Sequence, residues 1–192
     1  GNEPVTVSLT LKNPERKATA LKEVRGEVEL YMPSKDANSV AEVPKFLSTA
    51  GKPLTHKALK ANGVEFSLVS PAQLAAEKKR LGDIKRKEYK DAGYDNEDDI
   101  NSMVSSYVES LVHADENDVI ARIKDPTKRI QEISYVDATG DVKRVSTSDS
   151  EGFTVLSTWS GKPQADWKLR VSMKTPKNIV RVPFTLTNVA LP

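Results

Sequence analysis

Three stretches of this sequence alternate apolar and polar residues almost without exception, and this alternation constrains the fold most. The stretches are residues 5–11 (VTVSLTL), 167–173 (WKLRVSM) and 180–186 (VRVPFTL). Successive side chains of an extended strand point to opposite faces, so each stretch can place one side in a core and the other in water. One stretch lies near the N-terminus and two lie near the C-terminus. We therefore expect both ends of the chain to belong to one sheet system.

Shorter runs of the same kind predict further strands over residues 24–32, 64–68, 119–123, 130–136, 142–145 and 153–159. Gly26 falls on the apolar side of its run, which indicates a bulge or the close approach of another segment. Gly140 suits the turn of a hairpin between two of the runs. Residues 34–62 show no regular pattern, and residues 146–152 are expected to form a polar loop. Roughly eight to ten short strands separated by turns predict an antiparallel sandwich.

The middle of the chain changes to a helical pattern. Ser70 and Gln73 can form a capping box around Pro71, which predicts the start of a helix. A second helix is expected from about Asp95, and its apolar stripe consists of Ile100, Met103, Val104, Tyr107, Val108 and Leu111. Because the first helix is mainly basic and the second is acidic, we expect a hairpin over about residues 71–113. An exposed stripe would mark a partner surface, whereas a covered one would make the hairpin part of the domain.

Composition allows one domain and argues against several kinds of protein. The 192 residues are enough for an ordinary core, so we expect one β-sandwich domain over residues 1–192 with a helical insertion over 70–114. A formal net charge of +2 creates no field that would draw the chain to nucleic acid or to an anionic membrane. The longest apolar runs are only a few residues, too short to span a membrane. Without cysteine, the chain has no disulfide, thiolate metal site or cysteine nucleophile.

Few residues offer catalytic or metal chemistry. His56 and His113 are the two histidines, no Gly-x-Ser-x-Gly motif occurs, and the glycines are too scattered for a phosphate-binding loop. His113 follows the second helix, where it suits the negative end of the helix dipole. An acidic cluster could offer oxygen atoms to calcium, but it lacks the order of a calcium loop. Its members are Asp91, Asp95, Glu97, Asp98 and Asp99. We interpret the cluster as compensation of the helix dipole and expect neither a metal nor a cofactor.

Two basic triplets, Lys78–Arg80 and Lys85–Lys87, lie seven residues apart and stack along the first predicted helix. Such a surface can contact phosphates. However, acidic residues interrupt it, the acidic second helix opposes its field, and no aromatic residues are interleaved for stacking on bases. We therefore interpret the triplets as a solvated, partner-facing helix surface and expect no nucleic-acid binding.

The two tryptophans, Trp159 and Trp167, raise the question of a carbohydrate platform. Both fall on the apolar phase of their predicted strands, where packing in the core is the usual role of an aromatic side chain. Trp159, however, is followed at once by a turn, which gives it access to solvent. Trp159 is therefore the candidate ligand-binding residue.

The two ends of the chain resemble a group of proteins. Residues 21–28 (LKEVRGEV) resemble the opening basic residue, strand and glycine of uncharacterised β-rich proteins from bacterial cell envelopes. Residues 182–192 (VPFTLTNVALP) resemble their closing strand and terminal Leu-Pro. The resemblance implies an extracytoplasmic immunoglobulin-like sandwich; it includes neither the helical hairpin nor any functional residue. Because the first residue is Gly1 rather than methionine, we expect a processed or recombinant fragment without its own N-terminus.

Together these patterns predict a mainly β protein, an antiparallel immunoglobulin-like β-sandwich with an inserted helical hairpin. We expect a non-enzymatic binding or structural module of a bacterial periplasmic, cell-surface or secreted protein, with a protein or a polysaccharide as partner. The basis is a strong fold pattern without a reactive set of residues. One alternative is a carbohydrate-binding module that uses Trp159. Another is a hydrolase with two carboxylates in a cleft, whose spacing no sequence reveals.

Overall fold

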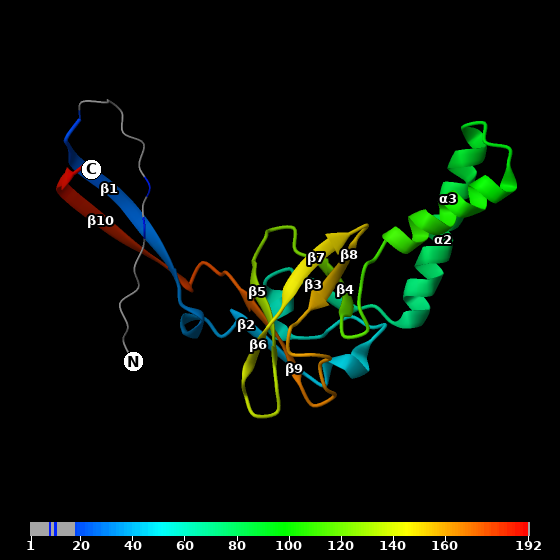
Figure 1. The fold of residues 1–192 in the computed structure, drawn as a ribbon. Coiled ribbons are helices and arrows are strands. Elements are labelled where there is room, and N and C mark those ends of the chain that lie inside the picture. Colours follow the sequence, from blue (N-terminus) through cyan, green and yellow to red (C-terminus); the bar gives the residue numbers. More distant parts are fainter. Residues whose placement is uncertain (1–7, 9, 11–17, 192) are drawn as a thin grey trace. The chain divides into compact units, whose positions relative to one another are not determined.

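The structure is a computed structural model and describes residues 8, 10 and 18–191 (Figure 1). Its contacts divide the chain into two compact units. The first unit combines Gly1–Leu30 with Val180–Pro192, and the second unit is Tyr31–Ile179. The strand predicted over residues 5–11 falls largely outside the described residues and stays a prediction.

The first unit contains a two-stranded ribbon of β1 (Ala20–Tyr31) and β10 (Ile179–Ala190). At one end the Leu191 N–H donates to the carbonyl of Thr19 at 2.9 Å. The strands therefore run antiparallel, and the described segments closest to the two ends of the chain share this sheet. The alternating stretch over residues 167–173 contains β9 (Lys168–Met173), which belongs to a different sheet in the second unit.

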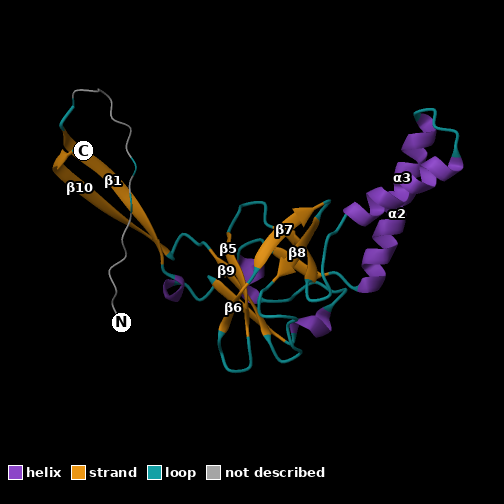
Figure 2. Ribbon diagram, viewed as in Figure 1, coloured by secondary structure: helices purple, strands orange, loops and turns teal. Residues whose placement is uncertain are grey.

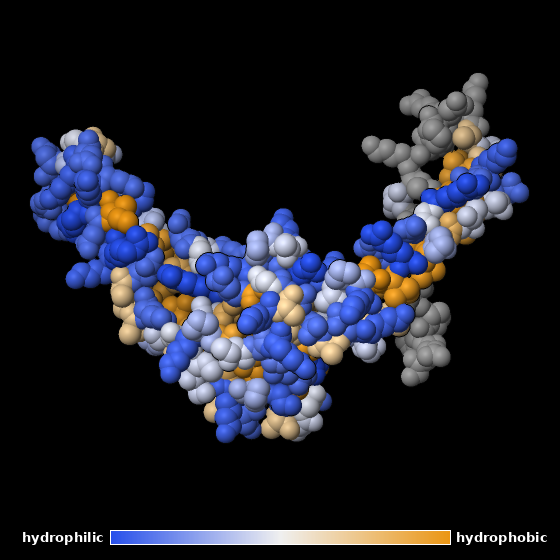
Figure 3. Space-filling view, turned by 180° about the vertical axis from the view of Figure 1, so that it is seen from behind, coloured by the Kyte–Doolittle hydropathy of each residue, from blue (hydrophilic) through white to orange (hydrophobic). Residues whose placement is uncertain are grey.

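The ribbon buries none of its side chains completely. Leu30, Val182 and Leu186 expose 37%, 42% and 47% of their surface, and apolar atoms are visible on the ribbon in Figure 3. Gly26 is the predicted point of close approach: two ring atoms of Phe184 lie 2.7 Å from the position that a Cβ would take. The ring therefore packs against bare backbone.

The second unit contains two four-stranded antiparallel sheets (Figure 2). The first sheet has the order β2 (Val40–Pro44), β9 (Lys168–Met173), β5 (Ile130–Val136) and β6 (Val142–Arg144). The second sheet has the order β3 (Glu65–Leu68), β4 (Val119–Lys124), β8 (Phe153–Ser157) and β7 (Ser146–Ser150). One core cluster takes buried side chains from both sheets, among them Tyr135 and Leu156. The prediction of a mainly β, antiparallel protein is confirmed.

The polar loop predicted over residues 146–152 is wrong, because β7 occupies most of it. This edge strand pairs with β8 from Ser146, opposite Ser157, to Ser150, opposite Phe153. Its exposed side chains carry no alternation, and the hydrogen bonds to β8 alone define the strand. The chain then turns at Gly152, whose φ of +79° suits glycine.

Residues 34–62, where the sequence is irregular, contain β2 and three short helical segments. These segments are η1 (Pro33–Lys35), η2 (Phe46–Thr49) and α1 (Lys57–Ala61). Phe46 of η2 and Leu59 of α1 are buried in the core cluster. This region therefore closes part of the core between the two sheets.

The helical hairpin consists of α2 (Pro71–Asp91) and α3 (Glu97–Ser110), which follow β3 and precede β4. The predicted capping box is confirmed: the Gln73 N–H donates to Ser70 Oγ at 3.2 Å, and the Ser70 N–H donates to Gln73 Oε1 at 3.1 Å. The second cap is Asn96 rather than Asp95, one residue later than expected.

The apolar stripe of α3 is covered. Ile100 is 0% exposed and Val104 is 9% exposed. A Cβ on Gly82 of α2 would lie 3.1 Å from Val108 Cγ2, so the glycine allows the two helices to approach closely. At the base of the hairpin, Leu111 packs in a second apolar cluster with Phe153 of β8. The hairpin is therefore packed within the second unit. None of the described helices is long and apolar enough to cross a membrane.

Candidate functional site

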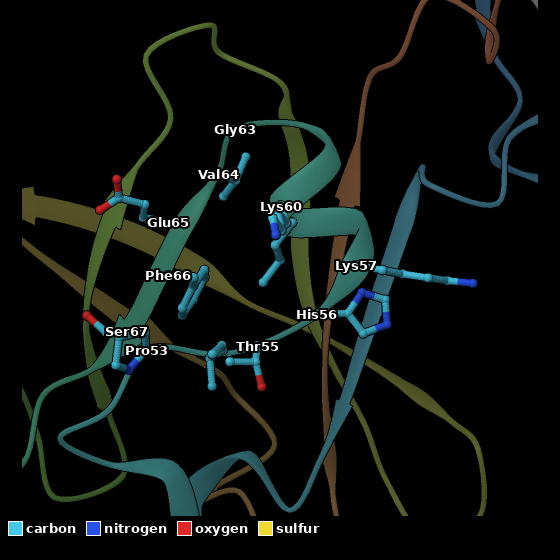
Figure 4. A pocket seen from close by; sticks show the side chains of 12 residues that line it. Pro53, Thr55, His56, Lys57, Lys60, Gly63, Val64, Glu65, Phe66 and Ser67 are labelled. Carbon is cyan, nitrogen blue, oxygen red and sulfur yellow. The ribbon is translucent and has the colours of Figure 1, made fainter.

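A cavity of about 740 Å³ lies between α1 and β3, and we call it the α1–β3 groove (Figure 4). Its floor is apolar and consists of the buried side chains of Leu54, Leu59, Val64 and Phe66. Its rim is polar and includes Thr55, Lys57, Lys60, Glu65 and Ser67. An apolar floor with a few polar groups around it is typical of a binding site.

The floor of the groove follows from the way in which α1 ends. Gly63 has a φ of +67°, a left-handed conformation that commonly ends helices. Its N–H donates to the carbonyl of Lys60 at 3.2 Å, and the Val64 N–H donates to the carbonyl of Leu59 at 3.0 Å. These two bonds define a Schellman motif, which usually brings together the apolar side chains of these outer positions. Here the pair is Leu59 and Val64, both in the groove.

The other wall of the groove is the edge of a sheet. β3 has β4 on one side, and on the other side it meets only the irregular segment before α1. In this segment the Leu54 N–H donates to the carbonyl of Phe66 at 2.7 Å, and Pro53 forms a bridge to Ser67. The groove was not predicted from the sequence. The one available signal was the Asn62-Gly63 turn, which also marks many loops that line no cavity.

A second cavity, of about 480 Å³, shares Pro53 and Ser67 with the groove and reaches α2 and β4. We call it the arginine cavity because Arg80 and Arg122 line it, together with Glu77. Glu77 Oε1 lies 2.6 Å from Arg80 Nη2 and 3.6 Å from Arg122 Nη2. The hydrogen bond from Arg80 and the charges of both guanidinium groups hold the pKa of Glu77 below its ordinary value.

Trp159, the predicted ligand-binding residue, is fully exposed. The strand predicted over residues 153–159 ends earlier, at Ser157, so Trp159 lies in the following loop and not on the apolar face of the strand. The same loop continues to Lys162, which lines a cavity of about 260 Å³ together with Ser70 and Asp118. Whether Trp159 binds a ligand stays a prediction.

Trp167 has a structural position. It is half-buried and packs against the main core, with its ring 6.2 Å from that of Tyr135. Tyr135 also stacks on Phe46, with ring centroids 5.3 Å apart. Among the described residues the Tyr135 hydroxyl has no hydrogen-bond partner. Burial, assisted by the charge of Asp118, raises the pKa of this hydroxyl far above its ordinary value.

The histidines do not meet in one site. His56 caps α1, since its Nδ1 accepts a hydrogen bond from the Ala58 N–H at 3.2 Å. His113 is exposed beyond the end of α3. His56 also lines the α1–β3 groove, together with Thr55 and Ser67, but its recorded side-chain hydrogen bond is to the backbone of α1 and not to either hydroxyl.

The charged residues of the hairpin pair with one another. Glu97, from the acidic cluster, accepts hydrogen bonds from Lys90 and Arg86 of α2, and the Lys90 bond lowers the pKa of Glu97. Within the described part of the chain, no three His, Asp or Glu side chains are arranged to hold a metal ion. In the basic triplets, Lys85 donates to Glu88 at 2.6 Å. Much of the predicted helix surface is therefore engaged in local ion pairs.

Comparison with known proteins finds no matching family model, no similar curated protein and no similar solved structure. The class of the protein therefore rests on its own coordinates: a mainly β chain with an inserted helical hairpin and an apolar groove beside an edge strand.

Proposed function

We propose that this chain is a non-enzymatic binding module and that its α1–β3 groove receives an apolar segment of a partner protein. The observation that carries the proposal is the groove itself, with about 740 Å³ of space over four apolar side chains. This volume lies within the range of roughly 300–1,000 Å³ that binding sites occupy. The proposal rests on the apolar floor rather than on strand pairing, because the carbonyls of Phe66 and Leu68 on this edge of β3 already accept hydrogen bonds from Leu54 and Gly51.

The wider setting is part of the same proposal. Two sheets around a shared core support a sandwich for the second unit. The order β2-β9-β5-β6 differs from the A-B-E-D order of immunoglobulin domains, so the immunoglobulin-like description extends to the two-sheet architecture only. A periplasmic, cell-surface or secreted location in bacteria rests on the resemblance of the chain ends. Fractionation of cells that make the natural protein tests it, and recovery from the cytosol would contradict it.

An uncharged apolar fluorophore, N-phenyl-1-naphthylamine, tests the groove. In ¹H–¹⁵N spectra of the uniformly labelled protein, we expect the dye to shift the amide signals of Leu59, Val64 and Phe66. Thr55→Trp places an indole at the rim of the groove and should abolish these shifts. Thr127→Trp, at an exposed position outside the groove, is the matched control and should retain them. Shifts confined to the ribbon, or no shifts at all, would overturn the proposal.

A second candidate function is carbohydrate binding through Trp159. The specific observation in its favour is the full exposure of this indole, in a loop that continues to Lys162 in the lining of a cavity. Aromatic side chains with one open face commonly bind sugars through apolar contact. In a Trp167→Phe background, Trp159 is the sole tryptophan, and soluble polysaccharides should change its fluorescence. An unchanged spectrum with the plant, bacterial and fungal polysaccharides of a standard panel would exclude this function.

A further inference from the structure

We propose that the partner segment is acidic as well as apolar, and that one of its carboxylates binds Arg122 in the arginine cavity. The inference rests on the proposed function, because it names the chemistry of the segment that the groove receives. It assigns Arg122 as the residue that selects an acidic partner.

The first observation is continuity between the two cavities. The α1–β3 groove and the arginine cavity share Pro53 and Ser67 in their walls. β3 rises about 3.3 Å per residue, so its four residues span roughly 13 Å. A short extended segment that places an apolar side chain over Val64 can therefore reach the arginine cavity with a residue a few positions away.

The second observation concerns hydrogen-bond donors. Arg80 already donates to both carboxylate oxygens of Glu77, at 2.6 and 3.1 Å. The Arg122 guanidinium group lies 3.6 Å from the same carboxylate and, within residues 18–191, its side chain donates no hydrogen bond to a protein group. The Cζ atom of its guanidinium group lies 4.8 Å from the centroid of the Phe153 ring, a cation–π contact that favours this position of the side chain. A positioned guanidinium group with unused donors is suited to bind a carboxylate.

The third observation is the balance of charge. In the arginine cavity one carboxylate, Glu77, faces two guanidinium groups, which leaves an excess positive charge. At the rim of the groove, Lys57 and Lys60 form no ion pair within the described part of the chain. Both cavities are therefore complementary to an acidic segment.

The size of the site favours a peptide over a small molecule. The groove has about 740 Å³ and the arginine cavity about 480 Å³, and together they exceed the roughly 1,000 Å³ at the upper end of small-molecule sites. The bridge between Pro53 and Ser67 separates them, so an occupant must pass over it. An extended main chain can do this while its side chains enter the two cavities.

A random heptapeptide library displayed on phage tests the inference against the intact chain. We expect selected peptides to combine apolar residues with Asp or Glu. When the Arg122→Gln variant is the target, the selected peptides should no longer be enriched in Asp and Glu but should still be enriched in apolar residues. With the control variant Arg144→Gln as the target, the selected peptides should keep both enrichments. If the Thr55→Trp variant, whose groove is blocked, selects the same peptides as the unchanged protein, or if no peptides are selected at all, the proposed function fails. If groove-dependent peptides carry no acids, or Arg122→Gln selects the same acids, only the present inference fails.

The affinity of one selected acidic peptide, measured by fluorescence anisotropy, tests whether each variant weakens or strengthens binding as the inference requires. Arg122→Gln should weaken binding about tenfold or more, and Arg122→Lys should restore it only in part, because lysine lacks the planar fork. Glu77→Gln removes the competing carboxylate and should strengthen binding by about threefold. Thermal unfolding of each variant confirms that it is folded. Weaker binding to Glu77→Gln, or equal binding to Arg122→Gln, would overturn the inference.

Discussion

The helical hairpin and the terminal ribbon are both pairs of amphipathic elements, yet only the hairpin covers its apolar side chains. In α3, Ile100 is fully buried and Val104 nearly so, because α2 packs over them. In the ribbon, Val182 and Leu186 remain 42% and 47% exposed. The difference lies in geometry. Two helices can turn their apolar stripes toward each other. Two paired strands form a single layer, so the side chains of neither strand can cover those of the other.

A two-stranded ribbon in water is at best marginally stable, because no second layer covers its apolar face. Two contacts inside this ribbon are specific. Phe184 covers the bare backbone of Gly26, and Arg181 donates to Glu29 at 3.1 Å. Such contacts align the strands without creating a core. The hairpin should therefore contribute to the stability of its unit, while the ribbon should contribute little to the stability of its own.

The largest effect is expected at the buried stripe of the hairpin. Ile100→Ala removes a fully buried side chain from between two helices and should lower the free energy of unfolding by about 2–5 kcal/mol. Urea denaturation followed by circular dichroism measures this change. Ile84→Ala on the exposed side of α2, where the side chain is 43% exposed, is the control and should change stability by about 0.5 kcal/mol or less. Equal effects of the two variants would show that the stripe is not packed.

A smaller effect is expected from crowding the contact between the helices. Gly82→Leu places a side chain where even a Cβ would be 3.1 Å from Val108 and 3.4 Å from Val104, so the helices must separate. We expect a loss of about 1–3 kcal/mol in the free energy of unfolding. Ala75→Leu, at an exposed position of the same helix, controls for the addition of a leucine side chain to the helix. Replacing glycine raises helix propensity by itself, by most of about 1 kcal/mol, so any measured loss is a lower bound on the cost of crowding. A stabilised Gly82→Leu variant would contradict the close packing described here.

In the ribbon a similar truncation should have almost no effect. Leu186→Ala removes a side chain that is already half exposed, so the free energy of unfolding should change by no more than about 0.5 kcal/mol. Hydrogen exchange should be faster for the amides of β1 and β10 than for those of α2, since local opening of the ribbon disrupts no core. A loss above about 2 kcal/mol, typical of a buried leucine, would mean that another surface covers this face.

The smallest effect concerns the ion pairs at the tip of the hairpin. The bond from Lys90 keeps the pKa of Glu97 below its ordinary value, so the ionised form favours the folded hairpin. This contribution is complete above the ordinary pKa of a glutamate and is lost as the pH falls through the lowered pKa. Lys90→Met should raise the pKa of Glu97 in an NMR titration of its side-chain signals. Lys87→Met, an exposed neighbour on the same helix, should leave it unchanged.

Local patterns predicted the elements whose partners are near in the sequence. The capping box of Ser70 and Gln73 depends on residues three positions apart, and the structure confirms it. The stripe around Ile100 was predicted because apolar residues spaced three or four positions apart fall on one side of a helix. Strand β7 was missed for the opposite reason: its polar side chains show no alternation, and only β8, reached through a turn, makes it a strand.

The groove and the arginine cavity lay beyond such patterns. Leu59 and Phe66 are near each other in sequence, but their joint role as a cavity floor depends on the turn at Gly63 and on the segment that crosses β3. Arg80 and Arg122 come from a helix and a strand separated by the entire second helix. Trp159 was identified by type, whereas its full exposure follows from where β8 ends.

By itself the sequence determined the alternating strands other than β2 and β7, the start of the hairpin and the apolar side of its second helix. These properties depend on the period of side chains along the chain and on caps only a few residues long. Only the tertiary structure decided which apolar faces are covered, because coverage requires a second layer from elsewhere in the chain. The same packing decided that α3 buries its stripe, that the ribbon exposes its face and that an apolar groove opens beside β3.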